Sequence, residues 1–263
     1  MFKERLRAWY KKQGRLPSKA IYYRDGVGDS MYSKVLGNEV NKLESAYAAL
    51  KEELNSDMAA AGVSAAEKLQ ITAVVVTKRH HTRFYPRTDD NRENCQPGTC
   101  VDSMVTHPCF FDFFLQSHHA IQGTARPTYY FVIRNDMDFT ANQIQTFTNA
   151  LCYTYVRCTL PVGYAPPAYY ADQLCERARL YVKRINVEEI ADGPGRRPQR
   201  PRGEKNETKE ERKARIEAYN RILEEWETAV ADAWRNCQFG PMYQGEQSHG
   251  PWHAKLNDSM FWM

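Results

Sequence analysis

An aspartate closes a short β-prone stretch near the start of the chain. Residues 20–24 read AIYYR, and Asp25 follows them directly, ahead of Gly26. Because glycine permits a sharp turn, the pattern predicts a strand that carries a carboxylate out at its carboxyl edge. Catalytic and metal-binding carboxylates gather at that edge of open sheets, whereas most Asp-Gly pairs are simple turns. The run alone leaves both interpretations of Asp25 open.

Four further motifs, rich in basic and aromatic residues, follow in order. They read TKRHHTRFYP over residues 77–86, SHHAIQGTARP over 117–127, TYVRCT over 154–159 and PPAYYAD over 166–172. Together with the Asp25 run, these motifs resemble the C-terminal part of the PIWI domain of eukaryotic Argonaute proteins, over roughly residues 1–184. The resemblance implies an α/β, RNase H-like PIWI fold, a mixed sheet flanked by helices.

The resemblance also implies a reaction. The family cuts RNA with two divalent metal ions held by four side chains, and magnesium needs several oxygen ligands, so closely spaced carboxylates suit it. By motif, Asp25 and Asp172 match two of the four and are the predicted catalytic and metal ligands for Mg²⁺, with Mn²⁺ as the alternative ion. Without the motif, Asp172 is interpreted as an exposed helix carboxylate.

Two of the four ligands are not expected in this chain. In the family, an aspartate and a glutamate of the metal site precede the helix with which this sequence begins, as do the first three strands of the sheet. We therefore expect an incomplete fold that lacks its N-terminal strands. Magnesium binding is expected only when the upstream half of the domain is present.

Ten residues are predicted by the same resemblance to contact nucleic acid: Lys78, Arg79, His81, Arg83, His118, Arg126, Tyr155, Arg157, Tyr169 and Arg177. Lysine and arginine forks hold a phosphate backbone well, and Gly123 with Thr124 allows the chain to approach it closely. Taken singly, each basic residue is a solvated surface charge, and at least one of the adjacent Tyr169 and Tyr170 is a core aromatic. The two His-His pairs suggest a metal site, but they lack companion ligands at zinc spacing.

Composition sets limits on the class of protein. The 263 residues carry a net charge of only +4, so overall charge does not by itself indicate a nucleic-acid partner. The sequence has no 18-residue apolar run and no signal peptide, and we expect no role in a membrane. Seven cysteines without Cys-x-x-Cys pairs are expected to be reduced thiols of a cytoplasmic protein, with the nucleus as the alternative.

The elements that must position these residues alternate between strands and helices, which indicates an α/β class. Helices are predicted to end near Gly14, to span about residues 29–54, to begin at Thr140 with a capping box, and to span about 167–183. Strands are predicted at residues 19–24, 69–76, 100–106, 111–115 and 129–134. Residues 56–67 are predicted to be a loop or a short helical insertion.

The last third of the chain departs from the motif pattern. Residues 1–190 are predicted to be the C-terminal part of the PIWI domain, residues 191–207 a disordered Pro/Gly/Arg linker, and residues 208–263 a helical insertion with a C-terminal tail. The helix at about 208–236 has apolar residues in heptad-like order, and it packs on its own domain or binds a partner. This insertion suggests a fungal-type lineage.

The predicted function is small-RNA guide binding and guided RNA silencing, as part of a magnesium-dependent endoribonuclease. The predicted partners are a small guide RNA, a complementary target RNA and proteins of a silencing complex. The alternatives are a module that binds the guide and recruits partners without cleaving, and a non-functional truncated product.

Overall fold

The fold is seen in a computed structural model that describes residues 2–60, 62, 64–87, 94–182, 195–203 and 207–236. The chain divides into two compact units, residues 1–172 and 173–263, and each is described by itself. The predicted boundaries near residues 190 and 207 fall beside residues outside the described part and stay predictions. Among the described residues, no helix is long and apolar enough to cross a membrane.

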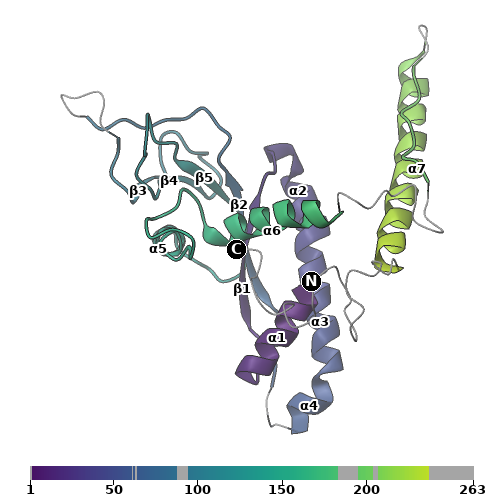
Figure 1. Cartoon of the computed structure of the whole chain (residues 1–263), viewed down its shortest axis with the longest axis horizontal. Helices are drawn as coiled ribbons and strands as arrows, with labels where there is room; N and C mark the ends of the chain where they lie inside the picture. Colours follow the sequence, from purple (N-terminus) through teal and green to yellow (C-terminus); the bar gives the residue numbers. More distant parts are fainter. Residues whose placement is uncertain are drawn as a thin grey trace. The chain divides into compact units, whose positions relative to one another are not determined.

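The first unit is built on a mixed five-stranded sheet with the order β1-β2-β5-β4-β3 (Figure 1). The strands are β1 (Lys19–Asp25), β2 (Gln70–Thr77), β3 (Thr99–Val101), β4 (Asp112–Gln116) and β5 (Thr128–Asn135). Strands β1 and β2 are parallel, and the other neighbouring pairs are antiparallel. The predicted mixed sheet of an α/β fold is confirmed.

The central position of β2 follows from its composition. Its run from Ile71 to Val76 is apolar apart from Thr72 and entirely buried, as expected for a strand covered on both faces. Side chains alternate along a strand, so Ile71 and Ala73 enter one core cluster while Val74 and Val76 enter the other. The two clusters therefore lie on opposite faces of one sheet.

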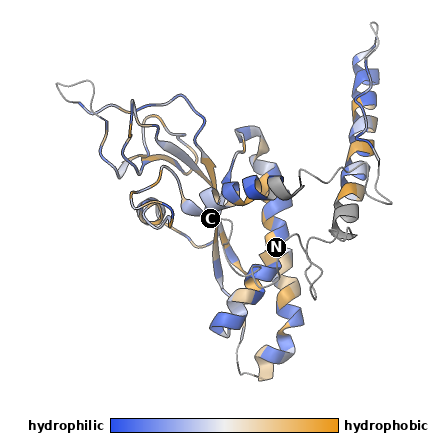
Figure 2. Cartoon of the chain, viewed as in Figure 1, coloured by the Kyte–Doolittle hydropathy of each residue, from blue (hydrophilic) through white to orange (hydrophobic). Residues whose placement is uncertain are grey.

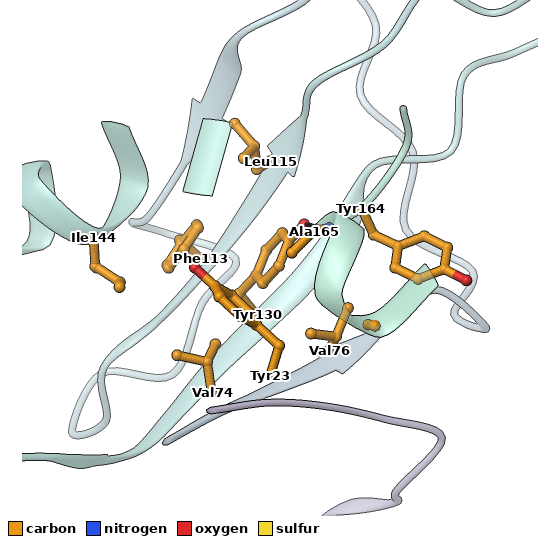
Figure 3. Packing of buried hydrophobic residues seen from close by; sticks show 10 residues of the cluster. Tyr23, Val74, Val76, Phe113, Leu115, Tyr130, Ile144, Tyr164 and Ala165 are labelled. Atoms are coloured by element: carbon orange, nitrogen blue, oxygen red, sulfur yellow. Dashed lines mark hydrogen bonds between the residues drawn. The ribbon is translucent and has the colours of Figure 1, made fainter. Parts of the chain in front are cut away.

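Helices cover both faces. The cluster around Ile71 includes side chains from α1 (Phe2–Gln13), α3 (Asn41–Glu53) and α4 (Asn55–Ala60). The cluster around Val74 includes Ile144 from α5 (Ala141–Leu151) and residues at the start of α6 (Pro166–Val182). Figure 3 shows Tyr130 in the middle of this second cluster, and its ring stacks on Phe113 at 5.1 Å between centroids. The fold of this unit is thus a sheet between two helical layers.

The helix predicted for residues 29–54 is interrupted. A 3₁₀ turn (Asp29–Met31) and the short α2 (Tyr32–Lys34) lead into a π-helical segment (Val35–Val40) before α3 begins. Val35 and Val40 are both buried and stand five residues apart. That spacing places two side chains on one side of a π-helix but on different sides of an α-helix, so the burial of both valines accounts for the wider turn.

One predicted boundary is confirmed and one moves, both for local reasons. The capping box at Thr140 is confirmed, since Gln143 N donates to Thr140 Oγ1 at 3.3 Å and Thr140 N donates to Gln143 Oε1 at 2.9 Å. The strand predicted to reach residue 106 ends at Val101 instead. Met104 has a φ of +65°, a left-handed conformation that a strand does not accommodate.

The second unit contains the end of α6 and the long helix α7 (Lys209–Asn236), which follows a second capping box formed by Thr208 and Glu211. Residues 195–203, within the predicted linker, have no regular secondary structure, and their carbonyl groups accept hydrogen bonds from side chains of α7. We call this segment the arginine strap. The disorder of the linker stays a prediction.

Candidate nucleic-acid interface

The parallel pairing of β1 and β2 brings two predicted site residues to one edge of the sheet. Asp25 is the last residue of β1 and pairs in register with Val76, and Lys78 follows β2 directly. Gly26 turns the chain away with a φ of +77°, and the Arg24 guanidinium donates to the Asp25 carbonyl. The half-buried Asp25 carboxylate is thus presented at the carboxyl edge, as the sequence predicts.

A short segment before α6 is fixed over the same edge by three buried hydrogen bonds. Ser117 Oγ donates to Val162 O at 2.5 Å, and Thr128 Oγ1 donates to Gly163 O at 2.6 Å. The Ala165 amide donates to Tyr130 Oη at 3.1 Å. These contacts, which we call the 162–165 clamp, join the ends of β4 and β5 to the entry of α6.

The clamp places Gly163 against the Lys78 side chain. A Cβ atom built on Gly163 would lie 2.7 Å from Lys78 Nζ and 3.2 Å from His118 Cε1. Only a residue without a side chain leaves both groups where they are, so glycine here serves close approach rather than turn geometry.

Aromatic rings form the other wall around Lys78. Tyr164 and Tyr169 stack at 3.9 Å between centroids, with 14° between their planes. Lys78 Nζ lies 5.1 Å from the centre of the Tyr164 ring and 5.9 Å from that of Tyr169, within the range of cation–π attraction. Figure 3 shows Tyr164 at the border of the core, with its hydroxyl pointing away from Phe113 and Tyr130.

The charge on Lys78 is only partly compensated. Burial lowers its pKa, the nearby Arg126 lowers it further, and Asp25 raises it. Within the described parts of the chain, no hydrogen bond or ion pair holds the ammonium group. A half-buried ammonium with three unused donors is a site for an anion, because a negative group there would restore the solvation that Lys78 loses.

Two imidazoles beside Lys78 have unused ring nitrogens. His118 Nδ1 is buried without a hydrogen-bond partner, and so is Nδ1 of His80, whose Nε2 lies 2.9 Å from Pro127 O. Burial lowers the pKa of both rings, and Lys78 lowers that of His118 further. Burial therefore favours the neutral form of both imidazoles, and Nδ1 of a neutral His80 is an acceptor when its Nε2 donates to Pro127 O.

The other predicted contact residues differ in how exposed their side chains are. Residues 78–81 alternate, so Lys78 and His80 are half-buried, whereas Arg79 and His81 are exposed. Arg83 turns back on its own loop, with Nη1 donating to Thr82 O at 2.7 Å and to His80 O at 3.1 Å. The residues that remain solvent-exposed are Arg126, Arg157 and Arg177, the last of them in the second unit.

Tyr155 differs from the exposed contacts. It is only 8% exposed and packs on both Tyr169 and Tyr170, with 5.2 Å between ring centroids in each case. Tyr170 in turn accepts the Val156 amide hydrogen at 3.0 Å. All three tyrosines thus take part in packing, and a contact of Tyr155 with RNA stays a prediction.

Asp25 and Asp172 both influence the pKa of the Tyr164 phenol. Burial is the largest cause of the raised pKa of Tyr164, and both carboxylates add to it. Asp25 is half-buried at the end of β1, while Asp172 is exposed on the second turn of α6. Carboxylate oxygens are the donors that magnesium prefers, so the pair fits this ion in kind. No group of three or more candidate metal ligands occurs in the described parts of the chain.

Sequence reasoning missed the residues that shape the lysine site. Gly163 and Tyr164 lie just before the PPAYYAD motif, and Ser117 and Thr128 lie at the ends of the SHHAIQGTARP motif. The signal that could have found them is a glycine directly before an aromatic residue, between two motifs predicted to face the same ligand. Their roles depend on contacts across 35–85 residues of chain, which spacing does not reveal.

A mixed sheet between two helical layers, with Asp25 and Lys78 at one edge, defines an α/β class of protein. A model of the Piwi domain matches residues 1–183, which is more than half of the chain. The chain therefore belongs to the Piwi-domain family.

Individual relatives agree. Protein argonaute MEL1 of Oryza sativa subsp. japonica is 44% identical over 189 residues, which cover 70% of this chain and 17% of the relative. Protein argonaute 5 of Arabidopsis thaliana is 41% identical over 199 residues, covering 73% of this chain and 18% of the relative. The chain thus spans about a sixth of the length of these relatives.

Solved structures give the same result. The C-terminal lobe of a budding yeast Argonaute superposes with a TM-score of 0.63 at 33% identity, covering 69% of this chain and 37% of that one. Kluyveromyces polysporus Argonaute with a guide RNA superposes with a TM-score of 0.62 at 32% identity, covering 69% and 22%. The arginine strap and α7 lie beyond the residues that the Piwi-domain model matches.

Proposed function

We propose that this chain binds a small guide RNA and serves in guided RNA silencing, as the C-terminal part of an Argonaute Piwi domain. The observation that carries the proposal is the Lys78 site. There a half-buried ammonium without an anionic partner lies between a stacked tyrosine pair and the Gly163 backbone. The membership of the family and the structural likeness to an Argonaute solved with a guide RNA support the same assignment.

The site suits a phosphate group of an RNA backbone. A phosphate oxygen accepts hydrogen bonds from an ammonium group, and the bond is strengthened by charge on both partners. Lys78 supplies the charge, and the unused His118 Nδ1 supplies one further polar contact. Exposed Arg79, Arg126 and Arg157 extend the positive surface from this point. Contacts of this kind read charge and shape, so base pairing by the guide selects the target RNA.

We further propose that Asp25 and Asp172 are two of the ligands of a magnesium site in the whole protein, with manganese as the alternative ion. When bound, the two metal ions of such a site would activate water and stabilise the leaving oxygen. The residues of this chain contribute two carboxylates near the Tyr164 phenol, and Lys78 keeps positive charge beside Asp25. A module that binds the guide without cleaving would use the same lysine site, so the carboxylates alone distinguish the two functions.

The fungal-type origin stays a prediction. The chain is similar to plant proteins at 41% and 44% identity and to yeast Argonautes at 32% and 33%, which does not separate the two lineages.

Binding of a 5′-phosphorylated single-stranded RNA to the full chain tests the lysine site. Lys78→Met keeps the aliphatic stem and removes the charge, and we expect affinity to fall about tenfold, which corresponds to about 1.4 kcal/mol. The slope of log affinity against log salt should become shallower by about 0.7. Gly163→Ala keeps the charge but puts a methyl group where Lys78 Nζ and His118 now lie, and it should weaken binding as well.

Two matched variants complete this test. Lys12→Met removes an exposed lysine from α1, and Gly37→Ala adds a methyl group where no atom lies within 4 Å. Both should bind RNA like the parent chain. Parental affinity in both Lys78→Met and Gly163→Ala would refute the lysine site as an RNA contact.

A further inference from the structure

The arginine strap and α7 form a structure to which the family comparison assigns nothing. Residues 195–203 read GRRPQRPRG, with four arginines and no acidic residue. The matched Piwi domain ends at residue 183, and the predicted contacts to the guide all lie between Asp25 and Arg177. The strap is therefore a concentration of positive charge outside the proposed guide site.

Three hydrogen bonds hold the strap antiparallel to α7. Trp226 Nε1 donates to Gly195 O at 3.1 Å, Tyr219 Oη to Pro198 O at 3.4 Å, and Arg215 Nη1 to Pro201 O at 2.7 Å. The donors are four and seven residues apart, so they lie on one side of the helix. In Figure 1 the strap runs beside α7 within this unit.

The strap is anchored at its end by an ion pair. Arg215 contacts Glu207 through Nε to Oε1 at 2.5 Å and through Nη2 to Oε2 at 2.8 Å. A Cβ atom on Gly203 would lie 2.8 Å from Arg215 Nη2, so the strap closes tightly over this pair. Glu207 is thereby occupied by Arg215 and does not neutralise the arginines of the strap.

The strap presents its charge outward in an extended form. Pro198 and Pro201 restrict φ and keep the segment from folding into a helix, and Pro198 is half-buried toward α7. Arg197, Arg200 and Arg202 are exposed, and in the described part of the chain no ion pair holds them. Along α7 itself, cations and anions are interspersed in the sequence, and Figure 2 shows this helix as largely hydrophilic with scattered hydrophobic positions.

We propose that the arginine strap is a second RNA-binding site, which holds the phosphate backbone of single-stranded RNA independently of the guide site. Guanidinium groups on an extended chain can each form a fork with a phosphate, and this binding requires little beyond charge. Protein interfaces usually need buried aromatic anchors. Here Tyr219 and Trp226 already donate to the strap, so an RNA backbone fits the exposed side better than an acidic protein does.

The test measures oligouridine binding to the full chain over a range of salt concentrations. The variant carries Arg197→Gln, Arg200→Gln and Arg202→Gln, which are exposed side chains whose loss leaves the three hydrogen bonds to α7 intact. Three lost phosphate contacts at roughly 0.7 each should make the log–log salt slope shallower by about 2. Arginine-to-lysine changes at the same three positions should restore most of the slope, because lysine retains the point charge.

A matched control removes the same charge from α7, through Lys209→Gln, Arg212→Gln and Arg221→Gln, all exposed. An unchanged slope in the strap variant, or an equal loss in the control, overturns the proposal. If the strap variant loses binding to polyglutamate but not to oligouridine, the strap binds an acidic protein rather than RNA. Lys78→Met distinguishes the two proposed RNA sites. If Lys78 does not contact RNA, the part of the salt slope that depends on the strap arginines is still present.

Discussion

Lys78 and His118 show how the same burial has different consequences for two neighbouring bases. Burial lowers the pKa of both groups, and the charge of Lys78 lowers that of His118 further. The reference pKa of lysine is far above neutrality and that of histidine is about 6.5. The shared environment therefore leaves a charged lysine beside a neutral imidazole, a pair that offers charge and a polar contact to one anion.

The lowered pKa of His118 predicts a pH dependence of stability. The unfolded chain takes up the proton more readily than the folded one, so acid favours unfolding. The stabilisation from neutral His118 is present above pH of about 6.5 and is lost as the pH falls through the lower folded pKa. In urea unfolding followed between pH of about 7 and 5, the midpoint should fall with pH, and His118→Asn should flatten that fall.

Ser45→Ala provides the comparison for this prediction, because it removes an exposed hydroxyl on α3 and changes no ionisable group, and it should keep the parental pH profile. His119 cannot serve as the control, since its charge also lowers the pKa of His118. His80 has its own lowered pKa, so some of the slope remains in His118→Asn. A midpoint that falls equally steeply in the parent and in His118→Asn would contradict the prediction.

Among the elements, the 162–165 clamp links the anion site to the sheet. Ser117 and Thr128 donate from the ends of β4 and β5 to the carbonyl groups of buried Val162 and Gly163. Removing a hydroxyl leaves a buried carbonyl without its donor, which is more unfavourable than the mean value of one hydrogen bond. The clamp therefore stabilises this edge of the sheet and holds Gly163 in position.

Removal of the clamp should lower stability and RNA affinity together. Ser117→Ala and Thr128→Val should each lower the free energy of unfolding by roughly 1–3 kcal/mol. RNA affinity measured well below the unfolding midpoint should also fall, because Gly163 and Tyr164 lose their fixed position. Ser45→Ala is the matched control, since its hydroxyl donates to Asn41 O on exposed α3, and it should change stability by less than about 0.5 kcal/mol. A stability loss with parental affinity would separate the clamp from the site.

The elements also show which features a single sequence can predict. The α5 start and the buried β2 run follow from local signals, a capping box and a continuous apolar stretch, and both are confirmed. The π-helical turn at Val35–Val40 and the hydrogen bonds between the arginine strap and α7 depend on what lies across from them, so propensity alone misses them. The same holds for the site, where the motifs predicted Lys78 but not its contact with Gly163, 85 positions further along the chain.

At the scale of the whole molecule, one polypeptide carries both the arginine strap and the Lys78 site. If the Lys78 site holds a guide and the arginine strap holds a second stretch of RNA, one chain contacts RNA at two places. Binding at two sites on one RNA raises the effective concentration of the second contact. The two units need not be rigidly placed for this effect, because a linker that spans the sites is sufficient.

Cleavage of RNA, which we propose for the whole protein, is the property that tests the carboxylate pair. The chain spans about a sixth of its curated relatives, so the test uses a full-length Argonaute that carries this segment. Asp25 and Asp172 come from different elements, β1 and α6, and both carboxylates add to the raised pKa of the Tyr164 phenol. If both hold magnesium, the loss of either should abolish cleavage, while an anionic side chain contributes nothing to holding guide phosphates.

We expect Asp172→Ala to reduce magnesium-dependent cleavage of a guide-matched RNA by about 10²-fold or more, at least the effect of losing one preorganised electrostatic contact. Guide affinity should stay within a few fold of the parent. Asp172→His should retain some activity, because an imidazole can coordinate a metal ion from the same position. Glu176→Ala, an exposed carboxylate one turn further along α6, should cleave like the parent. Parental cleavage by Asp172→Ala under limiting magnesium would make Asp172 a surface carboxylate, and the non-cleaving guide-binding module would then be the better assignment for this chain.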